Sequence, residues 1–283
     1  MMEKETVSEV PTTHDIIPAR RRILKMLGGG LLLGSPWLSS AWGNANNVVA
    51  ATAPKWAAGN TGLITVAYPD DSIFDSSNTC KIALTQATTE GPCYFGVETG
   101  EDISSGLSGL PMQLCLKLVD TACQPLENYW IEVWHCDNRG VYSGDTRGSF
   151  DSSHFAGAFC TSNDSAAQTS TWYRGILQTD SQGRVNFKTC FPGWYRGRTI
   201  HIHFTVRDRK GSSQVTSQFC FADAFSKEIC TTHEYYRSRG EQDTTLASGR
   251  DGVFPRSGYE NFMLTTRQNT DGSLLAYHTI KIA

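Results

Sequence analysis

Apolar and polar positions alternate in several stretches of the chain from residue 112 onward. The stretch 112–119 reads MQLCLKLV and the stretch 129–135 reads YWIEVWH. Both follow the period of two that places alternate side chains on opposite faces of a β-strand. Residues that favour turns separate them at 120–128, so we expect the two strands to pair as an antiparallel hairpin.

The same pattern predicts further strands in the rest of the chain. They are expected at 172–177, 184–190, 200–204, 217–222, 262–267 and 273–282. The last two flank a turn at 269–272, which indicates a closing hairpin. A short helix is expected within 225–240, and the polar stretch 144–171 reads as a long loop. This order of elements predicts an all-β fold, a β-sandwich with long active-site loops at one end and few short helices.

The stretch 191–204, FPGWYRGRTIHIHF, holds the densest candidate chemistry. Ile200, Ile202 and Phe204 alternate with His201 and His203, so the two imidazoles share the strand face opposite the apolar side chains. Two imidazoles at positions i and i+2 can converge on one metal ion. The plain alternative is a strand with two half-buried histidines.

Two tyrosines and an arginine favour the metal site. Tyr195 lies in the turn before the histidines, and Tyr142 follows the end of the strand predicted at 129–135. Phenolate is a hard anionic donor that favours a hard, highly charged ion. Two phenolates and two imidazoles therefore indicate Fe(III) rather than zinc, copper or Fe(II). Arg198 is placed to stabilise negative charge on a substrate.

Composition excludes some classes of protein. The chain has 283 residues, a formal net charge of −3 and no long basic run, so nucleic acid is not expected as a partner. Nine scattered cysteines without a CxxC pair argue against a zinc finger and favour disulfides or core positions. Their odd number leaves at least one without a partner in the chain.

The N-terminal region resembles an export signal. Residues 20–25 read RRRILK and precede a short apolar run and small residues near 41–45, a pattern typical of a signal peptide of the twin-arginine type. A basic helix start of a soluble protein is the alternative. The apolar run is too short to span a bilayer. We expect a periplasmic or secreted protein with no stable membrane insertion after signal removal, and three regions: a signal peptide at 1–45, an irregular linker or arm at 46–75 and a catalytic domain at 76–283.

From residue 89 to about 223 the chain resembles the intradiol ring-cleavage dioxygenases, the family of the catechol and protocatechuate dioxygenases. The stretches that carry the resemblance are TEGPCYF (89–95), Asp102-Ile103 with Gly106, Pro125-Leu126, EVWHCDNRGVYS (132–143), RGILQTDSQGRVNFKT (174–189) and FPGWYRGRTIHIHF (191–204). Only five residues separate Tyr195 from His201. This gap is shorter than in the better-known members and resembles a shorter, exported branch, so substrate specificity does not carry over.

The resemblance implies a role for each candidate residue. It implies one Fe(III) per chain, held by Tyr142, Tyr195, His201 and His203. It implies that Tyr195 leaves the iron and helps to take a proton when substrate binds, and that Arg198 stabilises charge. The expected substrate-binding residues are Tyr94, Gln218 and Trp194.

The reaction implied is Fe(III)-dependent cleavage of a catechol-type ring by O2 to a cis,cis-muconate-type diacid. The partners would be a small aromatic diol and O2, and a homo-oligomer stays open. One alternative is a secreted β-sandwich binding module that has kept the fold without turnover. Another is a zinc hydrolase that uses the His-x-His pair.

The remaining histidines read as structural. His135 shares a strand face with Ile131 and Val133, so we expect a hydrogen-bonded core histidine rather than a ligand. His233 and His278 have no candidate partners nearby in the sequence.

Overall fold

The computed structural model describes residues 55–283 except 75–78, 92, 94–98, 147–159 and 163. The predicted signal peptide and the first part of the predicted linker lie outside the described residues. Over the part of the chain that is described, no helix combines the length and the apolar character needed to cross a membrane.

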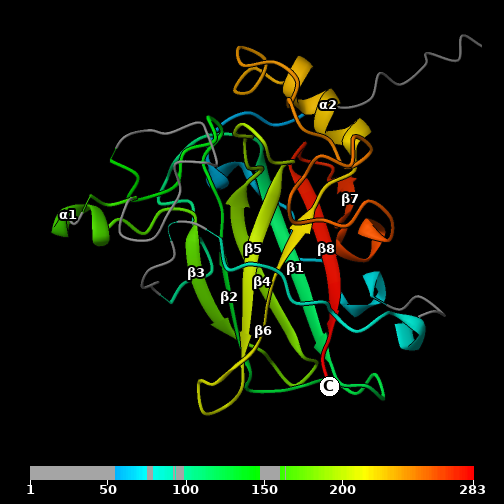
Figure 1. Cartoon of the computed structure of the whole chain (residues 1–283). Coiled ribbons are helices and arrows are strands. Elements are labelled where there is room, and N and C mark those ends of the chain that lie inside the picture. The colour runs from blue at the N-terminus through cyan, green and yellow to red at the C-terminus, as the bar shows by residue number, and fades with distance from the viewer. Residues whose placement is uncertain (1–54, 75–78, 92, 94–98, 147–159, 163) are drawn as a thin grey trace, which may run out of the picture. The chain divides into compact units, whose positions relative to one another are not determined.

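The described strands form two four-stranded sheets, which confirms the predicted β-sandwich (Figure 1). The first sheet has the order β4-β1-β8-β7 and the second has the order β3-β2-β5-β6. The first contains β1 (Pro111–Val119), β4 (Arg184–Cys190), β7 (Thr265–Gln268) and β8 (Leu274–Lys281). The second contains β2 (Trp130–Trp134), β3 (Arg174–Gln178), β5 (His201–Arg207) and β6 (Ser213–Cys220).

Helices are few and short among the described residues. The α-helices are α1 (Ser165–Gln168) and α2 (Asp223–Thr232), and the 3-10 helices include η1 (Thr61–Leu63), η2 (Asp71–Ile73), η3 (Thr79–Lys81) and η6 (Tyr259–Phe262). The short helix expected within 225–240 is therefore confirmed as α2, which begins slightly earlier. In Figure 1, α2 lies beyond one end of the strands.

The core lies between the two sheets and follows the period-two pattern. Strand β5 contributes Ile202, Phe204 and Val206, all almost fully buried in the main hydrophobic cluster. Phe204 stacks on Phe219 of β6, with ring centroids 4.1 Å apart and ring planes 10° apart. The apolar face of β5 is thus fixed in the core, and the opposite face is left for His201 and His203.

The predicted hairpin between the strands at 112–119 and 129–135 is wrong. β1 pairs antiparallel with β4 and parallel with β8, whereas β2 pairs with β3 and β5 in the other sheet. The chain turns tightly at the end of β1, where Leu126 N donates to Leu118 O at 3.0 Å, and then crosses to the second sheet. Every residue of β1 is buried, so a central place in a covered sheet suits it better than a hairpin edge.

The predicted closing hairpin is confirmed. β7 and β8 pair antiparallel around the turn that contains Gly272, whose φ of 82° is in the left-handed region that glycine tolerates. β8 lies between β7 and β1, so the hairpin is joined to the centre of the first sheet.

The described part of the predicted linker lies against the sandwich. Gly59 forms a β-bridge with Gly109, Asp71 pairs with Lys117 of β1, and the indole Nε1 of Trp56 donates to Glu228 of α2 at 2.9 Å. From residue 55 to residue 74 this stretch contains short 3-10 helices and no strand, and both backbone and side-chain contacts hold it against the sandwich.

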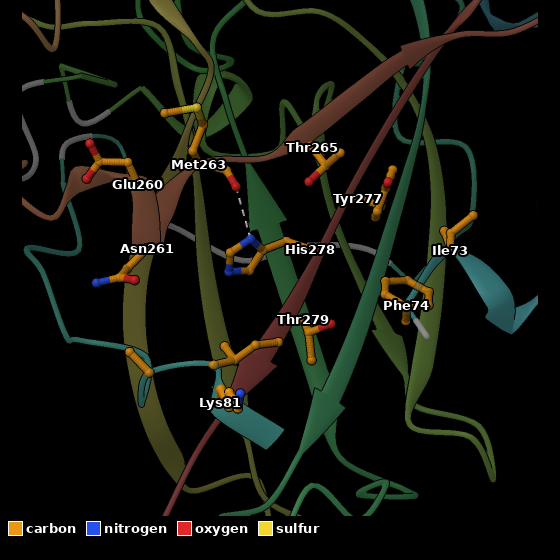
Figure 2. Close-up of a pocket in the computed structure, with 12 residues that line it drawn as sticks. Ile73, Phe74, Lys81, Glu260, Asn261, Met263, Thr265, Tyr277, His278 and Thr279 are labelled. Atoms are coloured by element: carbon orange, nitrogen blue, oxygen red, sulfur yellow. Dashed lines mark hydrogen bonds between the residues drawn. The ribbon is translucent and has the colours of Figure 1, made fainter. Parts of the chain in front are cut away.

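A cavity of about 420 Å³ lies between this arm, η6 and the β7–β8 hairpin (Figure 2). His278 of β8 points into this region, and its Nδ1 donates to Met263 O at 3.2 Å. Burial lowers the pKa of His278 to about 4, so the ring is neutral and structural, as expected. None of the candidate site residues that the structure describes lines this cavity.

Replacing Phe204 by alanine should destabilise the fold strongly. The ring is 1% exposed and stacked, so its loss removes buried area and leaves a cavity, at a cost of about 3–5 kcal/mol. Denaturant unfolding measures this free energy. The control Leu107→Ala, at a side chain 39% exposed, should change it by less than about 0.5 kcal/mol. Equal effects of the two substitutions would contradict the assignment of the core face of β5.

Candidate metal centre

Four side-chain donor atoms meet at one point beside β5. The hydroxyl of Tyr142 lies 2.9 Å from Nε2 of His203, 3.2 Å from Nε2 of His201 and 3.4 Å from the hydroxyl of Tyr195. Nε2 of His201 lies 3.0 Å from the Tyr195 hydroxyl and 3.1 Å from Nε2 of His203. All four side chains are at least 98% buried. The four residues predicted to act together are therefore together in the fold, and we call them the donor cluster.

The spacing of the donor cluster fits a single metal ion. Bonds of about 2 Å from a metal to nitrogen or oxygen place neighbouring ligand atoms about 3 Å apart, which matches the separations in the cluster. Among the described residues, no group of three or more His, Cys, Asp or Glu side chains could hold a metal. The fit to a metal therefore depends on the two phenols.

Strand register and hydrogen bonding orient the imidazoles. His203 pairs with Trp134 on β2 and with Gln218 on β6, and the Trp134 ring stacks on it at 5.0 Å with an interplanar angle of 8°. The Nδ1 atom of His201 donates to Thr199 O at 2.6 Å. That bond fixes the tautomer and leaves the Nε2 lone pair directed at the cluster.

The loops that carry the two tyrosines interlock through their backbones. Asp137 accepts from the backbone N–H of Val141 at 2.9 Å and closes the turn before Tyr142. A Cβ at Gly140 would lie 2.0 Å from the carbonyl oxygen of Trp194, and the φ of Gly140 is 85°. The N–H of Gly193 donates to Asp137 O at 2.9 Å. The turn before Tyr142 is therefore locked against the turn that carries Tyr195.

A third segment reaches the cluster along β6. Thr88 N donates to Thr216 O at 2.9 Å, and the side chain of Gln218 donates to Thr89 O at 3.0 Å. This segment includes Gly91, whose φ is 81° and where a Cβ would lie 2.2 Å from Cε1 of His203. Glycine is required here because the backbone packs directly on the imidazole.

Burial sets the protonation of the donor cluster. It raises the pKa of Tyr195 to about 12, against the opposite effect of the Arg198 charge. Burial, together with the neighbouring Tyr195, raises the pKa of Tyr142 well above its usual value. Burial and then nearby positive charge lower the pKa of His201 and His203 well below the usual range. The imidazoles are thus neutral and ready to bind a metal, whereas the phenols would have to release protons to become phenolate ligands.

The other predicted site residues lie in different surroundings. Arg198 donates through Nη2 to Oε1 of Gln218 at 2.5 Å, so these two predicted residues are adjacent and both buried. The indole of Trp194 donates to Gly240 O at 2.9 Å and lies 4.1 Å from the guanidinium of Arg239. Tyr94 lies outside the described residues. The substrate-binding roles of these residues stay predictions.

Two supporting residues were not predicted. Asp251 accepts from Nε of Arg198 at 3.0 Å, and Gln242 accepts from the N–H of Ile200 at 3.0 Å. Both are buried. They lie more than forty residues after the stretch they support, and in the sequence they look like ordinary loop residues, so no local signal could have identified them.

Seven of the nine cysteines are either disulfide-bonded or buried in the core, whereas Cys80 is exposed and Cys123 is half-buried. Cys93 and Cys160 form a disulfide within the buried group that includes Tyr142 and Tyr195. Burial raises the pKa of the thiol of Cys136 above its ordinary value, as it does for Cys115, Cys190, Cys220 and Cys230. These neutral thiols are core groups, and the prediction of disulfides or core positions rather than ligands fits them.

His135 is a hydrogen-bonded core residue, as predicted. Its Nδ1 donates to Cys136 O at 2.7 Å and its Nε2 accepts from the hydroxyl of Thr189 at 2.7 Å. Both nitrogens are therefore used, and none is left for a metal. Burial lowers the pKa of His135 to about 4.

The sequence and the fold were compared with known proteins. Residues 97–233 match the family model described as Dioxygenase. The intradiol ring-cleavage dioxygenase from Tetranychus urticae superposes with a TM-score of 0.60 and 24% sequence identity, covering 71% of this chain and 94% of that one. A second dioxygenase crystal structure gives a TM-score of 0.61 at 24% identity, with the same coverage.

A curated relative matches a shorter part of the sequence. The hydroxyquinol 1,2-dioxygenase of Corynebacterium glutamicum is 39% identical over 62 residues, which span 20% of this chain and 21% of that relative. Residues 97–233 match the dioxygenase family model, and the fold is that of the intradiol ring-cleavage dioxygenase structures. The resemblance to the intradiol ring-cleavage dioxygenases predicted from the sequence is therefore confirmed.

Gly91→Ala should displace the His203 ring and lower the metal content of the purified protein. The new methyl group would overlap the imidazole. The control is Gly106→Ala, since Gly106 has a similar φ of 75° but no atom within 4 Å of an added Cβ. Both variants pay about 1–2 kcal/mol for a left-handed alanine, so only Gly91→Ala should lose metal by elemental analysis. Equal metal contents in the two variants would refute the close contact.

The stability of the protein should depend on His135 in acid. The folded pKa of about 4 lies below the unfolded value of 6.5, so between these pH values the unfolded chain binds a proton that the folded chain does not. Stability from this residue is therefore complete above pH 6.5 and falls as the pH drops to 4, by up to about 3 kcal/mol. Denaturant titrations across this window should show a shallower fall for His135→Gln than for the wild type, and identical slopes would contradict the assignment.

Proposed function

We propose that this protein is an Fe(III)-dependent intradiol dioxygenase that cleaves a catechol-type ring with O2 to a cis,cis-muconate-type diacid. The observation that carries the proposal is the donor cluster, in which each of two phenol oxygens and two imidazole nitrogens lies within 3.4 Å of at least two of the others. The match of residues 97–233 to the dioxygenase family model supports it.

The donor set favours ferric iron over other metals. Phenolate oxygen is a hard, anionic ligand and suits a hard trivalent ion, whereas a zinc or copper site of this size would draw on Cys or further His ligands. Tyr142, Tyr195, His201 and His203 would hold the ion. Bound there, Fe(III) would draw electron density from a coordinated catecholate and so open its ring carbons to O2.

The chain itself supplies the proton chemistry and the charge. Burial raises the pKa of Tyr195 to about 12, and the charge of Arg198 opposes this effect. As a phenolate, Tyr195 would take a proton from a substrate hydroxyl. Arg198 would stabilise the negative charge that develops on the ring oxygens.

The buried surroundings exclude water and restrict the ring. Trp134 stacks against His203 and prevents the imidazole from rotating. Gln218 of β6 accepts a hydrogen bond from Arg198 and so holds its guanidinium group. Both atoms of O2 enter the diacid product, so the reaction as proposed needs no further reductant.

We also propose that the protein acts after export, in the periplasm or outside the cell, on the basis of the RRRILK stretch and its apolar continuation.

The test combines iron content, spectrum and turnover. Wild-type protein reconstituted with iron should show a visible tyrosinate-to-iron absorption band and consume O2 with a panel of catechols that includes hydroxyquinol. Tyr142→Phe should lose the band and lower iron content by more than about tenfold, because a phenyl ring offers no donor. The control is Tyr235→Phe, since Tyr235 is 37% exposed and should leave band, iron and turnover unchanged.

The outcomes separate the alternatives. Iron binding with a tyrosinate band but no O2 consumption with any diol of the panel would indicate a binding module without turnover. A colourless protein that takes up zinc in preference to iron would contradict the proposed metal.

A further inference from the structure

Arg198 is held by a segment of the chain that follows α2. Its Nε donates to Oδ2 of Asp251 at 3.0 Å, and its Nη2 donates to Gln218 at 2.5 Å. The side chains of Arg198 and Asp251 are 9% and 2% exposed. Two of the three guanidinium nitrogens are therefore fixed away from bulk water.

The carboxylate of Asp251 has donors on both of its oxygens. Oδ2 also accepts from the N–H of Thr199 at 2.8 Å. Oδ1 accepts from the N–H groups of Val253 and Phe254 at 2.9 and 3.0 Å. An amide in its place would turn its NH2 group toward N–H donors, so the site requires a carboxylate.

The segment that carries Asp251, residues 242–254, is itself anchored. Asp223 at the start of α2 accepts from the N–H groups of Leu246 and Ala247 at 3.0 and 2.9 Å. Leu246 and Phe254 pack in a small hydrophobic cluster with Cys220 at the end of β6. The segment therefore has a fixed position relative to both α2 and β6.

The segment 242–254 follows the region that matches the family model, which ends at residue 233. It nevertheless contacts the turn between Tyr195 and His201. Gln242 accepts from the N–H of Ile200 at 3.0 Å, and Asp251 holds Arg198 and Thr199. The support of the predicted charge-stabilising arginine thus comes from outside the matched region.

We propose that Asp251 is a positioning residue for the reaction. It holds the guanidinium of Arg198, together with Gln218, in one orientation beside the donor cluster, and its negative charge balances part of the arginine's positive charge. The segment 242–254 would thereby set how strongly the site binds an anionic aromatic diol. This inference rests on the proposed function.

The test is a double-mutant cycle on the iron-loaded enzyme. Asp251→Asn, Arg198→Lys and the double variant are compared with the wild type for kcat/KM in O2 uptake. The shift of the visible band on anaerobic titration with catechol gives the dissociation constant in the same proteins. Asp251→Asn should lower kcat/KM and weaken catechol binding by about 10- to 100-fold, the size typical of groups that orient a site residue. In the Arg198→Lys background the same substitution should change either quantity less than about threefold.

Controls separate positioning from general damage. Asp271 also accepts from several backbone N–H groups, those of Thr65, Val66 and Ser273, but it lies in the β7–β8 turn. Asp271→Asn should lower the thermal midpoint and leave kcat/KM unchanged. Iron content and the band of the substrate-free enzyme should be the same in Asp251→Asn as in the wild type, because the four donors stay in place.

Several results would overturn the proposal. It fails if Asp251→Asn is as harmful in the Arg198→Lys background as alone, or if it lowers iron content to the same degree as activity. If Asp251→Asn does not fold, Asp251→Glu replaces it in the cycle, because it keeps the charge but moves it by one methylene. A wild type that binds iron and catechol without consuming O2 would contradict the proposed activity, and the anaerobic titration would then decide the role of Asp251.

Discussion

The convergence of four buried donor atoms is the constraint on which the rest of the site depends. Two phenols and two imidazoles that are buried about 3 Å apart lose hydrogen-bond or metal partners if any ring moves, so neighbouring residues must hold each ring in place. Strand register supplies Trp134 and Gln218 on either side of His203. Close backbone contacts at Gly91 and Gly140 supply the rest. The loops can lie on the cluster because these positions have no side chain.

The charge around the cluster follows from the same burial. Neutral imidazoles and protonated phenols give the metal-free site no net charge. Among the contacts described above, the charged pair beside the site is Arg198 with Asp251. A trivalent ion with two phenolates would leave one positive charge for an anionic ligand to neutralise. Under the proposed function, a dianionic diol would bring two negative charges to that site, and protonation of Tyr195 would return it to neutrality.

The sequence predicted what is local and failed where the fold joins distant parts. The alternation in FPGWYRGRTIHIHF was enough to place both histidines on one face, because it depends on nearest-neighbour geometry. Tyr142 was predicted from its place after the strand at 129–135 together with the family resemblance. Which strands pair with one another depends on all the strands in the chain and cannot be read from one stretch. The local pattern therefore predicted that β1 pairs with β2, whereas β1 pairs with β4 and β8. Asp251 and Gln242 were missed for the same reason, since a loop residue has no pattern that reveals which buried arginine or backbone N–H it will meet.

The position of β8 has a consequence for synthesis of the protein. Residues 274–281 lie between β1 and β7, and their parallel pairing with β1 joins segments some 160 residues apart. The first sheet therefore lacks an interior strand until translation has passed residue 281. A ribosome adds about 5–20 residues per second, so the N-terminal part of the sandwich waits many seconds with that gap open. Pairings of such long range also form slowly. A nascent chain of this kind would depend on chaperones to shield β1 until its last partner is made.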